Sequence, residues 1–271
     1  MTKALTLFSN FLLIIAVLSL SACSKIESDV LTDATSTTNN VSASTIEAIK
    51  NLGFNPTGAT RVKDGILVEK DVILTDADLK SNTLSYEKSA PTEEQYRTTR
   101  LVKNLPRVIT IKVATTLPAI FISGTDEMIK RYNALGLKMT FQRITTGTPS
   151  INITQDETLP AGVLGVAGYP TLAGNPYSSV RIKTGTFSAT PKLGFVATVL
   201  AHEVGHAIGF RHTDYMARVC GGGNEGAGTM GAVLIPGTPA TIDYKSWMLS
   251  CAGSDVPFSA SDIIALNALY K

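Results

Sequence analysis

The residue types best suited to chemistry gather between residues 201 and 212, where the sequence reads AHEVGHAIGFRH. The chain contains three histidines, and all of them stand in this stretch, in the pattern H-E-x-x-H-x-x-G-x-x-H. Histidines at this spacing, with a glutamate directly after the first, are typical of a metal site that hydrolyses amide bonds. The stretch therefore predicts a zinc site with hydrolytic chemistry.

The spacing has a geometric reason. His202 and His206 are four residues apart, so on an α-helix they lie on one face, one turn from each other. Their imidazole nitrogens can then reach one Zn²⁺ at about 2.0–2.1 Å. Gly209 permits a sharp exit from the helix, after which His212 returns as the third ligand. Three neutral imidazoles leave a fourth position for water, as a catalytic zinc site requires.

Glu203 follows the first histidine and projects beside the metal, where it can take a proton from water as a general base. The plainer interpretation is an apolar core helix whose histidines have ordinary partners. That interpretation buries an unpaired carboxylate in a hydrophobic run, which is costly. The metal interpretation is therefore preferred.

A helix and a sheet must position these residues. The run from Leu193 to Phe210 is nearly apolar and predicts a buried helix. Alternation of apolar and polar residues predicts strands, and a Ser259–Asp262 capping box predicts a terminal helix. The order of elements indicates an α+β fold, with a twisted mixed sheet over the active-site helix and a smaller C-terminal part ending in a helix. The predicted strands are 108–114, 137–143, 150–154, an edge strand within 161–174, and 177–183; the other predicted elements are helices at 44–53 and 125–135 and one or two strands within 65–74.

The N-terminus predicts export. Lys3 precedes an apolar run from Phe11 to Leu20, which is too short to span a bilayer comfortably. The following Leu20-Ser21-Ala22-Cys23 resembles a lipobox, in which Cys23 is acylated. The alternatives are an ordinary cleaved signal peptide or an uncleaved anchor. We expect a protein that is lipid-anchored to the bacterial cell envelope, at the outer membrane or cell surface, or secreted; its membrane partner is reached through the N-terminal lipid.

The sequence predicts four segments along the chain. They are a lipoprotein signal peptide (1–22), a Ser/Thr/Asn-rich flexible tether (23–44), an N-terminal segment that is a possible pro-segment (45–103) and a zinc metallopeptidase domain (104–271). The net charge is only +2, and no stretch collects basic residues. The sequence therefore carries no electrostatic footprint for nucleic acid.

Two cysteines remain after Cys23. Cys220 and Cys251 are an even pair in a chain predicted to enter an oxidising compartment, and both stand in loop-like sequence. We expect a disulfide between them, with two buried thiols as the alternative.

The chain resembles the metzincin group of zinc peptidases and, more fully, the dual-action HEIGH metallopeptidase family. Here HEVGH stands where that family commonly has HEIGH. The segments that carry the resemblance are QYRTTRLV (95–102), RYNALGLKMTF (131–141), GNPYSSVRI (174–182), AHEVGHAIGFRHTDY (201–215), IPGTP (235–239) and SASDIIALNALY (259–270).

The resemblance implies a zinc-dependent endopeptidase that acts on polypeptides, with a methionine turn beneath the metal. Met248 is favoured for that turn over Met230. Tyr215 is a weaker candidate for stabilising an oxyanion, with core packing as the alternative. Asp214 is a candidate either for orienting a ligand histidine or for capping the next segment.

Three further expectations concern function. An extended substrate is expected to add as a strand to the edge near Gly165–Gly168. The segment Val68–Asp71 resembles an aspartate-bearing pro-segment motif whose carboxylate blocks the zinc, although a plain strand is the simpler interpretation. The alternative to an enzyme is a non-catalytic, zinc-stabilised surface-binding lipoprotein.

Overall fold

The computed structural model describes residues 41–81, 95–239, 241–251 and 253–271. A compact unit from Asn39 to Lys271 contains every described element. The predicted signal peptide, Cys23 and nearly all of the predicted tether lie outside the described residues. Within the described part of the chain, no helix is long and apolar enough to cross a membrane.

The elements follow the chain in a mixed order. The helices are α1 (Ala43–Leu52), α2 (Asp76–Lys80), α3 (Ala119–Asn133), η1 (Thr184–Thr186), α4 (Leu193–Ile208) and α5 (Ala260–Tyr270). The strands are β1 (Thr60–Val62), β2 (Gly65–Val68), β3 (Val72–Leu74), β4 (Tyr96–Arg97), β5 (Arg107–Val113), β6 (Met139–Arg143), β7 (Ile151–Gln155), β8 (Gly165–Val166), β9 (Ser179–Ile182) and β10 (Val233–Leu234).

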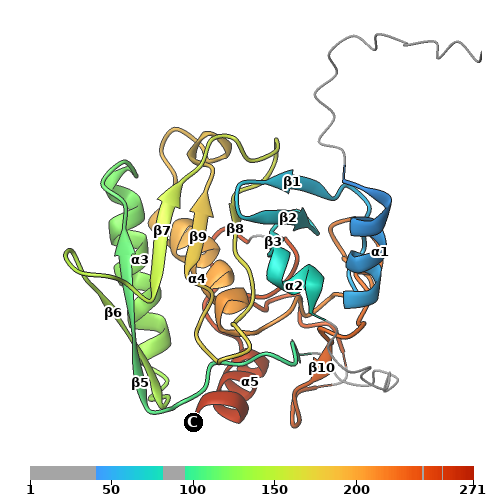
Figure 1. The fold of residues 1–271 in the computed structure, drawn as a ribbon. Helices are drawn as coiled ribbons and strands as arrows, with labels where there is room; N and C mark the ends of the chain where they lie inside the picture. The colour runs from blue at the N-terminus through green and yellow to red at the C-terminus, as the bar shows by residue number, and fades with distance from the viewer. Residues whose placement is uncertain (1–40, 82–94, 240, 252) are drawn as a thin grey trace, which may run out of the picture. The chain divides into compact units, whose positions relative to one another are not determined.

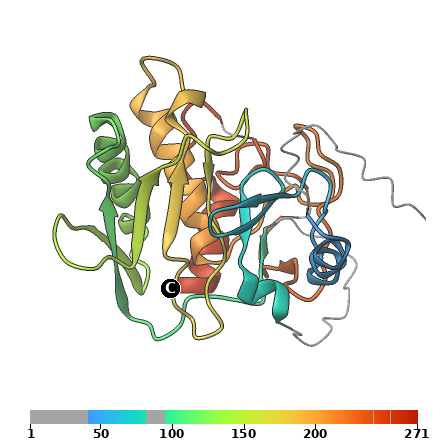
Figure 2. The ribbon, with the colours of Figure 1, turned by 45° about the horizontal axis from the view of Figure 1, so that its top comes forward.

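The main sheet has five strands in the order β6-β5-β7-β9-β8. Its first four strands are parallel, and β8 pairs antiparallel to β9 at one edge. Strands β5, β6 and β7 alternate as the sequence predicts, with Ile109 and Ile111 of β5 fully buried and Val108 exposed. Figures 1 and 2 show α3 and α4 side by side against one face of this sheet.

The two helices approach closely because α3 carries a glycine at their contact. A Cβ added to Gly124 would lie 2.6 Å from a methyl carbon of Val196 on α4, closer than real contacts allow. The apolar α4 is thus enclosed by the sheet, by α3 and by the residues that precede α5.

The C-terminal part closes the core beneath α4. Ser259 and Asp262 form the predicted capping box at the start of α5. The hydroxyl of Tyr270 donates to Ile208 O, and the indole of Trp247 donates to Ala201 O at 3.1 Å. The C-terminal part is therefore hydrogen-bonded to the α4 backbone at two positions. The predicted α+β class, with a mixed sheet over the site helix and a terminal helix, is confirmed.

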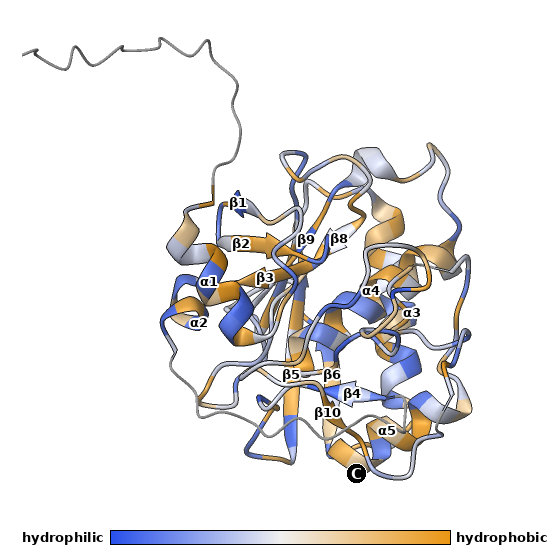
Figure 3. Ribbon diagram, turned by 90° about the vertical axis from the view of Figure 1, so that its right-hand side faces the viewer, coloured by the Kyte–Doolittle hydropathy of each residue, from blue (hydrophilic) through white to orange (hydrophobic). Residues whose placement is uncertain are grey.

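The described residues 41–81, upstream of the main sheet, are part of the same compact unit. β1, β2 and β3 form an antiparallel sheet whose last two strands are strongly hydrophobic, as Figure 3 shows. These strands and α1 share a buried cluster with Tyr169 and Met230, which come from later in the chain. The predicted boundary between residues 103 and 104 is therefore bridged by core packing, and the division into segments stays a prediction.

One helix begins earlier than predicted. α3 starts at Ala119 rather than at residue 125, because Pro118 occupies the position just before the first helical residue. A proline there costs no helix hydrogen bond, since the first backbone N–H groups of a helix have no partner inside it. The proline therefore starts this helix and does not interrupt it.

Candidate metal centre

Helix α4 carries His202, Glu203 and His206, and its end turns the chain toward His212. Gly209 adopts φ 115° and its N–H donates to the carbonyls of Gly205 and His206 at 3.1 and 2.9 Å. A Cβ on Gly209 would lie 2.6 Å from Arg100 O, so this turn needs glycine both for its left-handed backbone and for space.

The three imidazole rings converge. Their centroids lie 4.8 Å apart for His202 and His206, 4.8 Å for His206 and His212, and 5.2 Å for His202 and His212. The Nε2 atoms of His202 and His212 are 3.2 Å apart. This is the separation expected of nitrogens that share one cation with Zn–N bonds of about 2.0–2.1 Å.

Each ring is oriented through its other nitrogen. Nδ1 of His202 lies 2.8 Å from Trp247 O, and Nδ1 of His206 lies 2.9 Å from Phe210 O. Nδ1 of His212 lies 2.7 Å from Glu225 Oε1. Carbonyl and carboxylate oxygens only accept, so each Nδ1 donates its hydrogen and each Nε2 keeps a lone pair for a metal.

The electrostatics favour neutral rings at two positions. Burial, with the charge of His212, lowers the pKa of His202 to about 4. Burial and the neighbouring histidines also lower the pKa of His206 well below its ordinary value. Burial would likewise lower the pKa of His212, but the carboxylates of Asp71 and Glu225 raise it. A divalent cation at Nε2 of His212 would take the place of that ring proton.

Glu203 lies beside the histidines, against the edge strand. It is 2% exposed, and burial followed by the charge of Asp71 raises its pKa well above the ordinary value. A Cβ added to Gly165 of β8 would lie 2.9 Å from Glu203 Oε1, so the glycine provides the space for this carboxylate. Glu203 Oε2 and His206 Nε2 are both buried and have no hydrogen-bond partner among the described residues. Such partnerless acceptors fit a site that binds a cation and a water.

A fourth candidate ligand reaches the histidines from the upstream segment. Asp71 Oδ2 lies 3.1 Å from His212 Nε2. One ligand atom from Asp71 and one from each of the three histidines all lie within 4.8 Å of one another. The predicted ligand set contained the histidines alone, so the structure adds a carboxylate to the candidate centre.

The carboxylate that orients His212 is Glu225, and not Asp214, the candidate predicted from the sequence. Asp214 instead accepts from the N–H of Val219 at 2.8 Å and from the N–H and hydroxyl of Ser250 at 2.9 and 2.7 Å. Asp214 thus joins the loop after the third histidine to the segment after Met248. Glu225 stands in a glycine-rich stretch with no periodic pattern. The one sequence signal that could have pointed to Glu225 is that it is the only acidic residue of this stretch.

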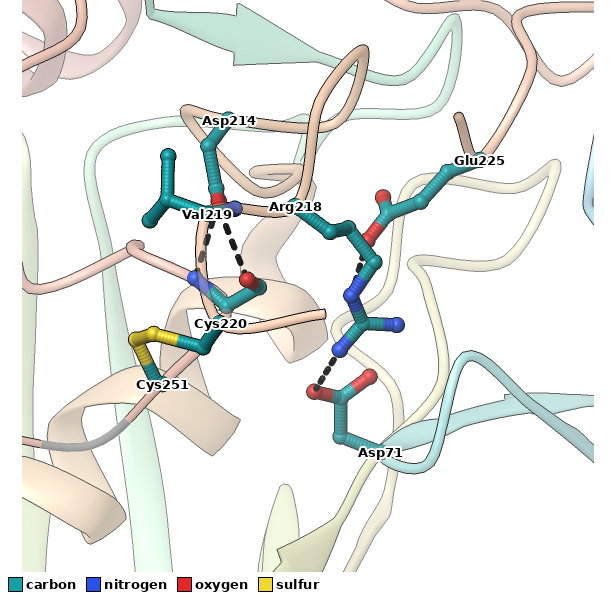
Figure 4. The surroundings of a disulfide bond; sticks show 8 residues. Asp71, Asp214, Arg218, Val219, Cys220, Glu225 and Cys251 are labelled. Atoms are coloured by element: carbon teal, nitrogen blue, oxygen red, sulfur yellow. Dashed lines mark hydrogen bonds and ion pairs between the residues drawn. A yellow bond between two sulfur atoms is a disulfide. The ribbon is translucent and has the colours of Figure 1, made fainter. Parts of the chain in front are cut away.

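Glu225 belongs to a buried ionic cluster next to the centre. The guanidinium of Arg211, fully buried, lies 3.3 Å from carboxylate oxygens of both Glu69 and Glu225. Arg218 lies between Glu225, at 3.3 Å, and Asp71, at 3.9 Å, as Figure 4 shows. Burial would raise the pKa of Glu225, but the charges of His212, Arg211 and Arg218 lower it to about 2. The ring-orienting carboxylate is therefore ionised.

The two methionine candidates occupy different places. Met248 is fully buried, and its sulfur lies against Gly205, between His202 and His206 on α4. Its carbonyl accepts from Thr213 N–H at 2.9 Å. Met230 packs in the upstream cluster with α1, β2 and β3. The structure thus places Met248 under the histidine helix, the position that the resemblance implies for the methionine turn.

Tyr215 packs as a core residue. Its ring meets Tyr96 edge-on, with centroids 4.5 Å apart, and the Arg211 guanidinium lies 5.5 Å from its centre. It is 6% exposed. These contacts are those of a core side chain, the alternative role expected for Tyr215, and they suffice to explain the residue.

Cys220 and Cys251 form a disulfide, with Cα atoms 6.0 Å apart. Figure 4 shows the bond beside Asp214 and Val219, so two links hold the loop after His212 to the segment after Met248.

Opening this disulfide is expected to lower stability. The bond closes a loop of 31 residues, and the chain-entropy model gives about 3–4 kcal/mol for a loop of this size. Replacing both cysteines by serine should therefore lower the free energy of unfolding by about that amount. Urea unfolding of the double variant against the oxidised parent measures it, and equal midpoints would contradict the expectation.

Glu225→Gln is expected to weaken zinc binding by about 10–100-fold, because the neutral amide supports the His212 N–H less strongly. Asp214→Asn is the matched control, since its carboxylate hydrogen-bonds Val219 and Ser250 rather than a ring. Competition with a chromogenic chelator measures both affinities. A larger loss in Asp214→Asn than in Glu225→Gln would reverse these assignments.

An α+β fold whose buried helix presents three converging imidazoles and a glutamate defines a metallopeptidase, a hydrolase that acts on peptides. The family model described as "Dual-action HEIGH metallo-peptidase" matches residues 66–270. The chain belongs to this family, and the resemblance stated from its sequence is confirmed.

Two solved structures of myroilysin are also similar to the chain. One, "Structure of myroilysin", has a TM-score of 0.43 and 18% identity and covers 65% of this chain and 98% of that one. The other, "Crystal structure of myroilysin", has a TM-score of 0.40 and 14% identity and covers 74% of this chain and 98% of that one. None of the curated proteins compared with the chain matches it.

Proposed function

We propose that the chain is a zinc-dependent endopeptidase with His202, His206 and His212 as metal ligands and Glu203 as the general base. The observation that carries the proposal is the convergence of three imidazole rings, with one nitrogen of each within 4.8 Å of the others, next to a buried carboxylate. A nitrogen-rich site of this kind suits zinc better than calcium or magnesium, which prefer oxygen ligands.

The chain's own residues supply the proton transfers. When bound, zinc polarises a carbonyl and lowers the pKa of water to about 7. Glu203 is placed to take a proton from the attacking water and to give it to the leaving amine. Its neighbours on β8 and α4 exclude solvent, which strengthens these electrostatic effects.

A cavity of 260 Å³ lies beside His202 and Glu203, and its other walls include Val199, Trp247 and Gly221. Its size suits one side chain of a substrate, next to the bond that is cut. The edge of β8 offers main-chain groups to an extended chain running past the site. A substrate held by its backbone on both sides of the cut favours cleavage within polypeptides, hence an endopeptidase.

We further propose that the enzyme is exported and held at the cell envelope by a lipid on Cys23, a proposal supported by the lipobox-like sequence alone. Cys23→Ala is expected to release the protein from membranes into the soluble fraction. Cell fractionation measures this, and unchanged membrane association would contradict it.

A second candidate function has one observation in its favour. With Asp71 beside the three histidines, the site offers four ligands, and closed four-ligand zinc sites are generally structural. Such a protein would be a non-catalytic, zinc-stabilised surface-binding lipoprotein. Glu203 argues against it, because a structural site gains nothing from a buried carboxylate beside the metal.

A peptide-cleavage assay separates the two functions. A peptide with an internal fluorophore and quencher, blocked at both ends, is incubated with the full chain and with Asp71→Ala, each freed of metal and then reloaded with zinc. We expect zinc-dependent cleavage that 1,10-phenanthroline abolishes, about 10²-fold or more above the metal-free protein. Absence of cleavage by both proteins, despite bound zinc, would support the structural role instead.

A further inference from the structure

We propose that a second cavity, separate from the metal centre, binds a carboxylic acid with an apolar body. The cavity has a volume of 630 Å³, against 260 Å³ for the one beside His202 and Glu203. Sites for small molecules have volumes of about 300–1,000 Å³. The second cavity is called the carboxylate cavity here, and the residues that carry the proposal are Asp78, Arg100, Arg107, Leu172 and Asn175.

The carboxylate cavity lies where three segments of the chain meet. Residues 75–78, at the start of α2, form one wall, and residues 169–178, before β9, form another. Arg107, the first residue of β5, completes the lining at the end where the parallel strands begin (Figure 1). Tyr169 belongs to this lining, and its ring meets that of His206 edge-on, with centroids 5.7 Å apart. No residue lines both cavities, so the second one is a site of its own.

Arg107 brings to the cavity a positive charge that no ion pair in the described part of the chain neutralises. Its guanidinium donates to Lys103 O at 3.4 Å and to Gly174 O at 3.3 Å. Nη1 and Nη2 both lie 3.5 Å from Asn175 Oδ1, so one neutral oxygen faces the fork of the guanidinium. A carboxylate places two charged oxygens in such a fork, and charge-assisted hydrogen bonds are about twice as strong as neutral ones. A ligand carboxylate can therefore displace the amide oxygen of Asn175.

A second guanidinium stands in the wall of the same cavity. Arg100 is 8% exposed, pairs through Nη1 with Asp78 and donates through Nη2 to Ser81 Oγ at 3.0 Å. Its Nε is buried and has no hydrogen-bond partner among the residues that the structure describes. A buried donor without an acceptor is costly, so native structures seldom leave one. This wall therefore holds a donor that the described residues do not satisfy, beside a cavity large enough for a ligand.

The charges and the apolar walls favour a carboxylic acid over a phosphate. The charged residues of the lining are Arg100, Arg107 and Asp78, so two positive charges and one negative charge leave a net charge of +1. A carboxylate neutralises this charge, whereas a phosphate dianion would reverse it. Leu172, 61% exposed, and Pro176 line the same cavity and offer an apolar surface to the rest of the ligand.

Binding of N-acetylleucine to the zinc-loaded full chain tests the proposal. The compound carries one carboxylate and one apolar side chain, and it has no bond between two amino acids that a peptidase could cut. N-acetylleucine amide is the matched compound without the charge. Isothermal titration calorimetry, in a buffer free of carboxylates and phosphate, should show that the acid binds about tenfold or more tightly than the amide. Equal affinities, or no binding of either compound, would overturn the proposal.

Variants of Arg107 show whether the acid binds in the cavity or at the zinc. Arg107→Gln should weaken binding of the acid about tenfold or more, and Arg107→Lys should weaken it less, because it keeps the charge and loses only the fork. Arg143→Gln is the matched control, since Arg143 pairs with Asp126 at 2.6 and 2.9 Å and should leave the affinity unchanged. Circular dichroism melting confirms that each variant is folded, and Arg107→Lys carries the test if Arg107→Gln is not. Unchanged affinity in the folded Arg107 variants would place the acid elsewhere and refute the site.

Two further compounds define the ligand. A hexapeptide that ends in leucine with a free carboxylate is titrated into Glu203→Gln, which prevents its cleavage. If this peptide binds more tightly than N-acetylleucine, the ligand is the C-terminus of a peptide, and equal affinities identify a small organic acid. If inorganic phosphate binds through Arg107 and more tightly than N-acetylleucine, the carboxylate assignment is wrong. These titrations measure binding and not cleavage, so they decide the site whether or not the chain cuts peptides.

Discussion

Glu203→Gln is expected to reduce the turnover number of the zinc-loaded protein by about 10²–10⁴-fold, the range typical for removal of a general base. Glutamine has nearly the same shape as glutamate, so it fits against Gly165 and the fold is kept. It cannot accept a proton at neutral pH, so water is no longer activated. Initial rates on the quenched peptide, in both the wild-type and Asp71→Ala backgrounds, measure the loss.

The zinc content of Glu203→Gln shows whether its activity is lost because the general base is missing or because the metal is missing. Glu203 is assigned as a base and not as a ligand, so Glu203→Gln should still bind one zinc per chain. Glu157→Gln is the control, because its carboxylate accepts hydrogen bonds from Thr184 and Gly185 at an exposed position. A Glu203→Gln protein with full zinc and full activity would remove Glu203 from the mechanism.

His206→Ala is expected to have the second large effect, the loss of the metal itself. Nε2 of His206 is buried, and the centroid of its ring lies 4.8 Å from that of each of the other two histidines. Removing this imidazole leaves two histidines and at most the Asp71 carboxylate, so zinc should bind more weakly, its content after dialysis should fall well below one per chain, and activity should fall with it. Atomic absorption on the dialysed protein provides the measurement.

Thermal melting adds an independent readout for this variant. A ligand that binds only the folded state stabilises it, by about 4 kcal/mol at a concentration 1,000 times its Kd. Zinc should therefore raise the Tm of the wild type and leave that of His206→Ala unchanged. A zinc-dependent rise of equal size in both proteins would place the metal elsewhere.

The parts of the site that lie close together in sequence were predictable. The positions of His202, Glu203 and His206 follow from the period of one helix, and His212 follows from the turn at Gly209. Met248 was placed under the helix through the family resemblance. These inferences needed only local geometry or a sequence pattern.

The parts that depend on long-range contacts were only partly predictable. Glu225 reaches His212 from a glycine-rich loop whose path is set by Arg211, Arg218 and the disulfide. Asp71 reaches the same ring through a hairpin whose turn has two left-handed, non-glycine residues, a conformation without a sequence signal. The sequence suggested a blocking carboxylate in Val68–Asp71, but only packing against β8 and Arg211 supplies its geometry.

In the fold, too, the elements set by local sequence patterns were predictable, and the features set by long-range contacts were not. Strands β5, β6 and β7 were found from alternation, because alternate side chains in them are buried, whereas β9 was found although it buries three residues in a row, Val180, Arg181 and Ile182. The start of α3 was missed, because a proline before a helix and a proline that ends one look alike without the neighbouring contacts. The glycine at position 124 is explained by Val196 of α4, which no local pattern indicates.

Selective ¹⁵N labelling of histidine, followed by NMR of the zinc-loaded chain, tests the central claim most directly. The chain has three histidines, so every labelled ring belongs to the proposed site. We predict three rings that all carry hydrogen at Nδ1, bind metal through Nε2 and do not titrate between pH 6 and 8. A ring that titrates freely, or one bound through Nδ1, would contradict a single cation held by His202, His206 and His212.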